Sequence, residues 1–384
     1  MRFGSSEVWT QTTIGKIAQV VGGGTPETDN LDYWNGNIQW FTPSEVGQTK
    51  SIEKSERTIS VDGLNKSSAK LLPVGTLLLS TRATVGECSI ALNECSTNQG
   101  FQSLIASDKV NNEFLYYLIA TKKRHFVKYA CGSTFLEISN KEVAKTKIFV
   151  PQQRVQEKIA TFLSKIDQRI ETQSKIIEDL ELVKKGISNT VFGDKSVIKK
   201  SWETVKLSTI LKERKTYDIK DSVYPHATLS KEGISAKTDR YNRDFLVKDE
   251  EKEYKITHLN DICYNPANLK FGVICLNTFG DAIFSPIYIT YEIDNQCDPY
   301  FISLYLTNPT FIGHIRKYEQ GTVYERMAVS SEDFLKGEIN LPTYEEQLKI
   351  AKTFKSIDEK IAIEQVILDK LKEQKKFLLS NMFI

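Results

Sequence analysis

The strongest constraint on the fold is a long helical segment that occurs twice in the chain. Residues 148–167, IFVPQQRVQEKIATFLSKID, align with residues 339–358, INLPTYEEQLKIAKTFKSID, at a spacing of 191 positions (339 against 148). The match continues to the end of both segments, where Phe192 falls on Phe383. Similarity of this length at one fixed spacing indicates an internal duplication, so we expect two units built on one plan.

Apolar residues recur in both copies at alternating spacings of four and three. This pattern, kept over several heptads, is typical of a coiled coil, in which each helix buries its apolar stripe against a partner helix. The predicted seam consists of Ile159, Leu163, Ile166, Ile170, Ile177, Leu180 and Ile187 in the first copy and of Ile350, Phe354, Ile357, Ile361, Leu368, Leu371 and Leu378 in the second. Polar residues interrupt both seams at equivalent positions, Gln173 with Glu364 and Lys184 with Lys375, which is how a coiled coil fixes register and partner.

Each helix is expected to begin near a proline, Pro151 or Pro342, and about 39 residues at 1.5 Å each give a helix of roughly 58 Å. A single amphipathic helix could instead pack only on its own domain. The duplication argues against that alternative, because two matched helices in one chain are natural partners for each other. We expect them to pair antiparallel about a pseudo-twofold axis.

The segments between the helices differ in sequence although their ends agree. Both units open alike, with WTQTTIGKI from Trp9 and WETVKLSTI from Trp202. Drift alone should not preserve a solvent-facing helix better than the domain beside it, so the divergent middles favour two recognition surfaces of different specificity. We predict an α+β fold with two mixed α/β domains, each followed by a long helix, with boundaries at 1–150, 151–193, 194–341 and 342–384.

Composition limits the possible classes of function. The 51 basic and 49 acidic residues nearly cancel, so no whole-molecule field draws the chain to nucleic acid or to an anionic membrane. The six cysteines form no C-x-x-C pair, which favours a reduced, cytoplasmic protein without a metal site. No apolar run reaches the roughly 20 residues needed to cross a bilayer. The nearest candidate, LLPVGTLLLS at residues 71–80, is better explained as a buried strand with its turn.

Catalytic motifs do not match the sequence well. NPAN at residues 265–268 resembles the motif with which amino-methyltransferases hold a flipped adenine, but Asn268 replaces the aromatic residue that stacks on the base. The glycines at residues 22–24 precede Thr-Pro rather than a helix, so they form neither a dinucleotide-binding nor a phosphate-binding loop. No G-x-S-x-G or H-E-x-x-H motif occurs. We therefore expect no catalytic site, metal or cofactor on this chain.

Several stretches resemble the specificity subunit of type I restriction-modification systems. They are GGGTPETDNLDYWNGNIQWFTPSEVG, TNQGFQSL, YNPANLKFG and the paired P-x4-Q-x2-IA helix starts, and the resemblance covers essentially the whole chain. It implies two target recognition domains that each read one half of a bipartite, asymmetric DNA site. It also implies that the two long helices set the distance between the halves and dock partner subunits.

The resemblance further implies a division of labour between subunits. Adenine methylation, the S-adenosylmethionine site and the ATP-driven motor would belong to partner subunits, so this chain would be a non-catalytic recognition subunit. The implied partners are double-stranded DNA and two modification subunits, while the presence of restriction subunits is left open. No membrane partner is expected.

Sequence readout needs side chains that reach base edges, and further basic and hydroxyl groups hold phosphates. We expect these residues on loops. In the first domain the candidates for base contact are Thr25, Glu27, Ser80, Thr81, Arg82, Asn98, Gln99, Ser133 and Thr134. The candidates for phosphate contact form one basic cluster, Lys122, Lys123, Arg124 and Lys128.

The second domain offers candidates of the same kinds. They are Ser230, Lys231, Arg240, Arg243, Asn265, Asn268, Lys270, Ser285, Tyr288, Thr322, Tyr324 and Arg326. For any single residue the plainer interpretation is a solvated side chain or a turn former, and Asn265 before Pro266 is first of all a turn signal. The clusters therefore carry more weight than their members.

An alternative from another class is a non-enzymatic adaptor, whose coiled coil joins protein partners and whose domains bind peptides or glycans. Trp34 and Trp40 could suggest a carbohydrate platform, but their alternation with turns makes them better core residues. Deleting one heptad from the first helix separates the two hypotheses, because only the DNA-reading protein would change the spacing of its site.

Overall fold

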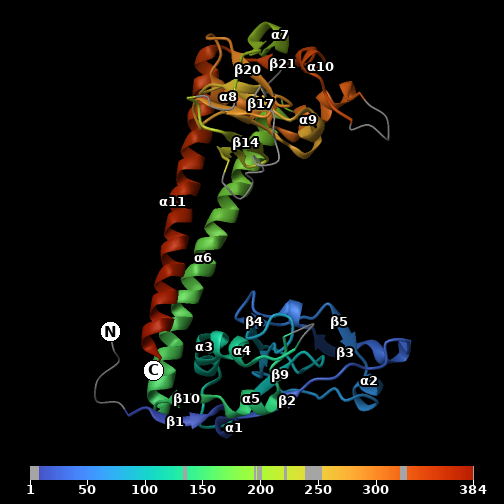
Figure 1. Ribbon diagram of the computed structural model, residues 1–384, viewed down its shortest axis with the longest axis vertical. Coiled ribbons are helices and arrows are strands. Elements are labelled where there is room, and N and C mark those ends of the chain that lie inside the picture. The colour runs from blue at the N-terminus through green and yellow to red at the C-terminus, as the bar shows by residue number, and fades with distance from the viewer. Residues whose placement is uncertain are drawn as a thin grey trace. The chain divides into compact units, whose positions relative to one another are not determined.

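The computed structural model (Figure 1) describes residues 8–132, 136–193, 196, 201–219, 223–237, 253–320 and 327–383. The chain forms two compact units, the first made of Met1–Ser174 with Val366–Ile384 and the second of Lys175–Gln365. Each unit contains one mixed domain and one end of each long helix, α6 (Gln153–Phe192) and α11 (Tyr344–Met382). The two repeated mixed domains and the two long helices confirm the predicted α+β fold.

The first domain contains a five-stranded sheet of order β2-β9-β6-β7-β4, a three-stranded sheet of order β5-β3-β8 and the pair β1-β10. Its strands are β1 (Thr10–Thr13), β2 (Ala18–Gly22), β3 (Trp34–Phe41), β4 (Ser51–Ile52), β5 (Arg57–Ile59), β6 (Leu77–Leu79), β7 (Cys88–Ala91), β8 (Cys95–Thr97), β9 (Gln102–Ala106) and β10 (Lys147–Val150). Its helices are α1 (Ile14–Ile17), α2 (Val61–Asn65), α3 (Asn112–Thr121), α4 (Lys123–Tyr129) and α5 (Asn140–Lys145), with short 3₁₀ helices at Leu31–Tyr33 and Pro43–Glu45.

Strand β6 lies in the middle of the five-stranded sheet and is buried on both faces. Leu77 and Leu79 join the core around α3, whereas Leu78 joins the cluster of Phe41 and Phe101, as the alternation of side chains along a strand requires. The expectation of a buried strand within LLPVGTLLLS is therefore confirmed. Among the described residues, no helix is both long and apolar enough to cross a membrane.

The second domain contains a four-stranded sheet of order β12-β20-β17-β18, a three-stranded sheet of order β13-β16-β19 and the pairs β14-β15 and β11-β21. Its strands are β11 (Glu203–Lys206), β12 (Leu211–Glu213), β13 (Tyr217–Asp218), β14 (Ala227–Ser230), β15 (Gly233–Ala236), β16 (Tyr254–Thr257), β17 (Ile262–Tyr264), β18 (Ile274–Leu276), β19 (Ala282–Phe284), β20 (Ile289–Ile293) and β21 (Glu338–Leu341). Its helices are α7 (Leu207–Ile210), α8 (Pro299–Leu306), α9 (Pro309–Ile315) and α10 (Ser331–Leu335), with 3₁₀ helices at Pro266–Phe271 and Arg316–Tyr318.

Both domains close in the same way. The opening strand pairs antiparallel with the strand that immediately precedes the long helix, so Thr10 faces Val150 in the first domain and Glu203 faces Leu341 in the second. In each domain this opening strand leads directly into a four-residue helix, α1 or α7. The similar openings seen in the sequence thus build the same frame twice, from which each long helix leaves.

A buried glutamine fixes each long helix to its domain. In the first unit the Gln156 side chain donates to the carbonyl of Pro151 (3.0 Å) and accepts from the backbone N–H of Asn111 (3.0 Å), the residue that caps α3. In the second unit Gln347 makes the same pair of contacts, at 3.1 and 2.9 Å. The P-x4-Q spacing therefore has a structural reason, because the glutamine satisfies backbone groups at the point where helix and domain meet.

The seam positions of both long helices are turned inward. Leu163 is fully buried and Phe354 is 1% exposed, whereas Phe162, next to Leu163, is 43% exposed. The polar seam residues Gln173 and Glu364 are also buried. At the ends, Phe383 packs on rings of the first domain and Phe192 on rings of the second, for example with centroids 5.6 Å from Phe114 and 5.7 Å from Phe301.

One carboxylate joins the two helices to the first domain. Asp167 of α6 accepts a hydrogen bond from the hydroxyl of Tyr117 in α3 (2.6 Å) and forms an ion pair with Lys375 of α11 (2.6 Å). A single carboxylate thus links three helices of the first unit.

The second unit repeats this arrangement with exchanged helices. Asp358 of α11 accepts from the hydroxyl of Tyr300 in α8 and pairs with Lys184 of α6. Position 167 of α6 thus meets position 375 of α11, while the later position 184 meets the earlier position 358. Because the order of partners is reversed, the helices run antiparallel.

The seam can be tested with neighbouring residues of opposite exposure. Leu163→Ala should lower the free energy of unfolding by about 2–5 kcal/mol, because it removes buried methyl groups and leaves a cavity. Phe162→Ala, the matched control, should change it by only about 0.5 kcal/mol, since the ring is partly in solvent. Urea denaturation of the purified chain measures both, and equal losses would contradict the assignment of the seam.

The Tyr300–Asp358 contact predicts a stability change at alkaline pH. Burial, together with the hydrogen bond to Asp358, raises the pKa of Tyr300. The pKa of Tyr300 in the folded chain therefore lies above its unfolded value near 10. The stabilisation that the Tyr300 hydroxyl contributes to the fold is complete below about pH 10 and is lost as the pH rises through the folded pKa. Tyr300→Phe should therefore be less stable than the wild type by about 1 kcal/mol at pH 8, with the difference shrinking above pH 10.

The exposed Tyr344 supplies the control for this experiment. Urea midpoints of wild type, Tyr300→Phe and Tyr344→Phe should be compared between pH 8 and pH 11. If the stability difference between the wild type and Tyr300→Phe stayed constant over this range, folding would not raise the pKa of Tyr300, and the prediction would be wrong.

Candidate nucleic-acid interface

Two loops of the first domain lie against each other through glycine. The backbone N–H of Gly24 donates to the carbonyl of Thr97 (2.8 Å), and a Cβ atom at Gly23 would lie only 2.0 Å from the carbonyl oxygen of Asn98. Only glycine permits so close an approach. The contact brings Thr25 beside Gln99, whose side-chain oxygen accepts from the Thr25 hydroxyl at 2.6 Å.

A third loop, residues 80–87, joins these two. The backbone N–H of Thr81 donates to the carbonyl of Gly100 (2.8 Å), and the space beside Gly100 is limited by Pro43 and Arg82. The Arg82 guanidinium is half exposed and forms an ion pair with Glu137 (3.1 Å). We call Thr25, Arg82, Asn98 and Gln99 the first loop surface: four predicted base-contact residues that the fold brings together.

The structure corrects two members of the predicted set. Ser80 and Thr81 are fully buried, so neither hydroxyl can reach a DNA base from this conformation. Ser80 bonds to the carbonyl of Arg82 (3.1 Å), and the Thr81 hydroxyl donates to the carbonyl of Gly100 (3.1 Å). Both hydroxyls satisfy backbone groups after strand β6, and this role is invisible in a sequence that shows only polar residues after an apolar strand.

Other residues near the first loop surface have mixed roles. Glu27 is exposed, and its carbonyl accepts from the indole N–H of Trp34 (3.1 Å). Asn98 uses its side-chain oxygen to accept from the backbone of Gly100 (2.8 Å). Thr84, which the sequence reasoning missed, is exposed and donates to the carbonyl of Pro43 (3.1 Å). Ser133 and Thr134 lie outside the described residues.

The predicted basic cluster lies at the start of α4, next to the same loop. A Cβ atom at Gly86 would lie 3.1 Å from the Cα of Lys123, and Lys123 forms an ion pair with Glu87. Arg124 and Lys128 are exposed, while Phe126 between them is fully buried and holds the helix in place. The cluster therefore lies beside loop 80–87, which also carries Arg82.

Two groups at this helix have lowered pKa values. Burial lowers the pKa of Lys122, which precedes α4. The pKa of His125 is also lowered, first by burial and then by the charges of Lys122 and Lys128. Both shifts disfavour the protonated form, and only at His125 do neighbouring cations add to the effect of burial.

In the second domain, two of the predicted lysines, Lys231 and Lys270, line a cavity of about 580 Å³. Lys231 lies at the tip of the β14-β15 hairpin, and Lys270 lies in the 3₁₀ helix Pro266–Phe271. Arg316 joins them at the cavity wall, and Phe271 is 62% exposed there. The sequence reasoning missed Arg316 and Phe271, although Phe271 stands within the quoted YNPANLKFG stretch.

Asn265 needs a correction. It is 9% exposed, and its side-chain oxygen accepts from the backbone N–H of Ala267 (3.1 Å), so it caps the 3₁₀ helix instead of facing DNA. Asn268 in the same helix is exposed.

The remaining candidates of the second domain have different surroundings. Ser230 is half-buried and donates to the carboxylate of Glu232 (2.7 Å) at the hairpin tip. Ser285 and Tyr288 form one turn, in which the Tyr288 ring lies edge-on to Phe284. The following candidates lie outside the described residues: Arg240, Arg243, Thr322, Tyr324 and Arg326.

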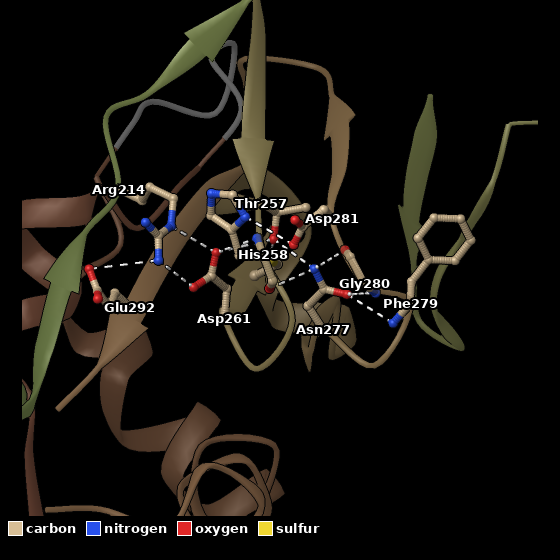
Figure 2. A network of polar contacts seen from close by, with 10 residues as sticks. Arg214, Thr257, His258, Asp261, Asn277, Phe279, Gly280, Asp281 and Glu292 are labelled. Atoms are coloured by element: carbon tan, nitrogen blue, oxygen red, sulfur yellow. Dashed lines mark hydrogen bonds and ion pairs between the residues drawn. The ribbon is translucent and has the colours of Figure 1, made fainter. Parts of the chain in front are cut away.

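A polar network holds neighbouring loops of the second domain in place (Figure 2). Arg214 donates twice to the buried carboxylate of Asp261, at 3.0 and 3.1 Å, and this contact raises the pKa of Arg214. Asp261 also accepts from the backbone of His258 (2.7 Å). The Asn277 side chain ties the same turn to the next one, through the carbonyls of His258 (2.8 Å) and Gly280 (2.9 Å).

Arg214 and Asp261 stand 47 positions apart in the sequence, and no short motif predicted the network. Its polar groups are directed at one another, so its role is to fix the two turns. At the outer side His258 contacts Asp281 (2.9 Å), and this hydrogen bond lowers the pKa of Asp281. The network thus gives the loops a fixed shape without offering a reactive group.

Among the residues that the structure describes, no group of three or more His, Cys, Asp or Glu residues could hold a metal ion. Burial raises the pKa of both Cys88 and Cys95 to about 12, so these thiols stay protonated and are poor nucleophiles.

Comparison with known proteins gives one consistent family. The model of the type I restriction modification DNA specificity domain matches residues 6–182 and again residues 199–373. The type I restriction enzyme MjaIX specificity subunit of Methanocaldococcus jannaschii is 35% identical over 223 residues, which cover 53% of this chain and 52% of that protein. The EcoR124I/EcoR124II specificity subunit of Escherichia coli is 26% identical over 162 residues, 40% of each chain. The chain thus matches about half the length, or less, of these relatives.

Solved structures share the fold over a longer range. The crystal structure of the type I restriction-modification system S subunit from M. genitalium has a TM-score of 0.61 and 16% identity, covering 100% of this chain and 98% of that one. A chain from a structure of the type I R-M system, concerned with complex assembly and conformational transition, gives 0.62 and 15%, covering 97% and 96%.

The family match lies over both units, each with a mixed domain and the end of a long helix. Its relatives are named specificity subunits, the recognition component and not a catalytic one. With two copies of the family domain on one duplicated frame, the chain belongs to the type I restriction-modification DNA specificity family.

Proposed function

We propose that this chain reads a bipartite, asymmetric DNA site and directs partner subunits to it. Residues 1–150 would form the first target recognition domain and residues 194–341 the second, each binding one half of the site. Residues 151–193 and 342–384, which contain the long helices, would separate the halves. The observation that carries the proposal is a frame that is built twice but carries different loop surfaces. The pairing of the opening strand with the strand before the long helix, the glutamine contacts and the carboxylate contacts occur in both domains. The exposed polar residues of the loops differ between them.

The first loop surface has the properties that base readout requires. Its residues come from three separate loops that backbone hydrogen bonds hold in fixed positions, and Gln99 and Arg82 end in groups able to make bidentate contacts. The basic cluster on α4 lies beside loop 80–87 and would hold phosphates. In the second domain, Lys231, Lys270 and Arg316 would serve the corresponding half-site.

The long helices supply both spacing and docking surfaces in this proposal. Half-sites read from one face of DNA lie about 34 Å apart, and a 40-residue helix is about 60 Å long, so its length is sufficient. Apolar residues outside the seam remain exposed on both helices, including Phe162, Leu182, Ile363 and Phe377. Such residues fit the docking of two modification subunits, which would carry the S-adenosylmethionine site, while ATP would bind restriction subunits where these are present.

The near-neutral charge has a consequence for DNA binding. A chain with a net charge of +2 should bind nonspecific DNA weakly by itself, because counterion release scales with the number of phosphates neutralised. We infer that partner subunits supply most of the remaining phosphate contacts.

Methylation mapping tests the proposed function directly. The chain should be co-expressed with a modification subunit, and adenine methylation of a plasmid mapped by single-molecule sequencing. We expect a bipartite motif with a fixed gap. Replacing residues 200–340 by those of a relative should change one half of this motif only. A swap that changes both halves of the motif would contradict the assignment of one half-site to each domain. If the complex forms but methylation does not depend on this chain, the proposed function itself is wrong.

Arg82 provides a test of the first loop surface. Arg82→Ala removes a bidentate donor, so it should cost about 1–3 kcal/mol of discrimination at one base pair and make that position of the methylation motif degenerate. Arg169→Ala, in an exposed position of α6, is the control and should leave the motif unchanged. An unaltered motif in both variants would show that Arg82 reads no base.

A further inference from the structure

The first unit contains a cavity of about 750 Å³ between the start of α4 and the C-terminal part of α11. This volume lies within the range of about 300–1,000 Å³ typical of small-molecule sites. Its wall carries six cationic side chains: Lys122, Lys123, Arg124, Lys372, Lys375 and Lys376. Only one carboxylate, that of Asp167, lines it.

Most of this positive charge has no partner within the part of the chain that the structure describes. Asp167 is shared between the Tyr117 hydroxyl and Lys375, and Lys123 pairs with Glu87. Ion pairs among the described residues thus reach two of the six cations. Lys372 and Lys376 are exposed on α11, facing a cavity whose opposite wall is also basic. An anion bound between these walls would relieve the mutual repulsion.

Only two of these six cations have a basic counterpart in the second unit, although both long helices are repeated. At the spacing of 191, Lys375 and Lys376 correspond to Lys184 and Lys185, but Lys372 corresponds to Glu181. At the same spacing Lys122 to Arg124 fall on Gly313, His314 and Ile315, which include no lysine or arginine. This set of cations is therefore not a by-product of the shared frame. The cavity of the second unit draws its cations, Lys231, Lys270 and Arg316, from other elements.

The arrangement of the cations indicates the ligand chemistry. Several ammonium groups and one guanidinium, distributed over two facing walls, match a ligand with several adjacent anionic oxygens better than a single carboxylate. Arginine and lysine are the residues that proteins use to hold phosphate groups. The apolar side chains of Ile170, Leu379 and Phe383 also line the cavity.

We propose that this cavity binds clustered phosphate groups. The phosphates could come from the DNA backbone beside the first half-site or from a free nucleoside triphosphate. The first source rests on the proposed function, and the second does not. In the first case the second long helix would contribute to binding at the first half-site, through Lys372 and Lys376.

The test uses the purified full-length chain and inorganic tripolyphosphate in isothermal titration calorimetry at low salt. The wild type should bind one equivalent. Lys376→Gln should weaken binding about tenfold, because it removes one charged hydrogen bond. Lys185→Gln, at the equivalent position of the other helix, should bind as the wild type does. The double variant Lys372→Gln/Lys376→Gln should show no saturable binding, with an unchanged urea midpoint because both side chains are exposed.

Competition then identifies the source of the phosphates. The site is assigned to the DNA backbone by two results together. A nonspecific DNA duplex displaces tripolyphosphate, and the salt dependence of DNA binding by Lys376→Gln is smaller than that of the wild type by about one phosphate contact. Displacement by ATP and not by the duplex assigns it to a nucleotide, and corrects the expectation that nucleotides bind partner subunits alone.

Absence of saturable tripolyphosphate binding by the wild type, or equal weakening by Lys376→Gln and Lys185→Gln, would overturn the proposal. Neither result bears on the methylation motif, which is read in the assembled complex, so failure of this site and failure of the proposed function are distinguishable.

Discussion

The structure depends on an apolar seam that neither long helix can bury alone. A helix of about 40 residues with one apolar stripe is stable in water only when another surface covers that stripe, and the duplication supplies that surface within the same chain. Antiparallel pairing follows from the ion pairs, which match early positions of α6 with late positions of α11. The consequence is that each compact unit includes residues from both copies of the repeat, so the fold of one domain is completed by the helix of the other.

On this frame, the two domains place their exposed loops by different means. The first uses glycine, because its loops approach so closely that the carbonyl oxygen of Asn98 would meet any Cβ atom at Gly23. The second uses a network of charged and amide side chains around Asp261 and Asn277 (Figure 2). Both devices fix loop shape through groups that are satisfied internally, which leaves neighbouring side chains free for contact with a ligand. A recognition surface benefits from this separation, since a side-chain atom that bonds to the backbone is not available to a base. Asn98 bonds to Gly100 through its side-chain oxygen, which leaves its amide nitrogen for such a contact.

The same separation explains which predictions from the sequence succeeded. Periodicity identified the two long helices, and the apolar run LLPVGTLLLS identified a buried strand, because burial repeats at intervals that a sequence displays directly. Three of the individual DNA-contact candidates were wrong. Ser80, Thr81 and Asn265 are polar residues beside turns, yet their side chains satisfy backbone groups inside the fold. Whether a polar side chain supports a loop or faces solvent depends on contacts between distant segments, and the Arg214–Asp261 pair shows that such contacts leave no local pattern.

The carboxylate contacts show how the repeat retains geometry while its sequence changes. Asp167 and Asp358 occupy equivalent positions, and each accepts a hydrogen bond from a tyrosine of its domain. The tyrosines are not equivalent, because Tyr117 lies six positions after the residue that caps α3 and Tyr300 only two after the residue that caps α8. The same contact is thus made from two different positions, so the contact itself is what the frame requires. In the cavity of the first unit, by contrast, Lys372 corresponds to Glu181, so its charge is not a requirement of the repeated frame and is better explained by a ligand than by the needs of folding.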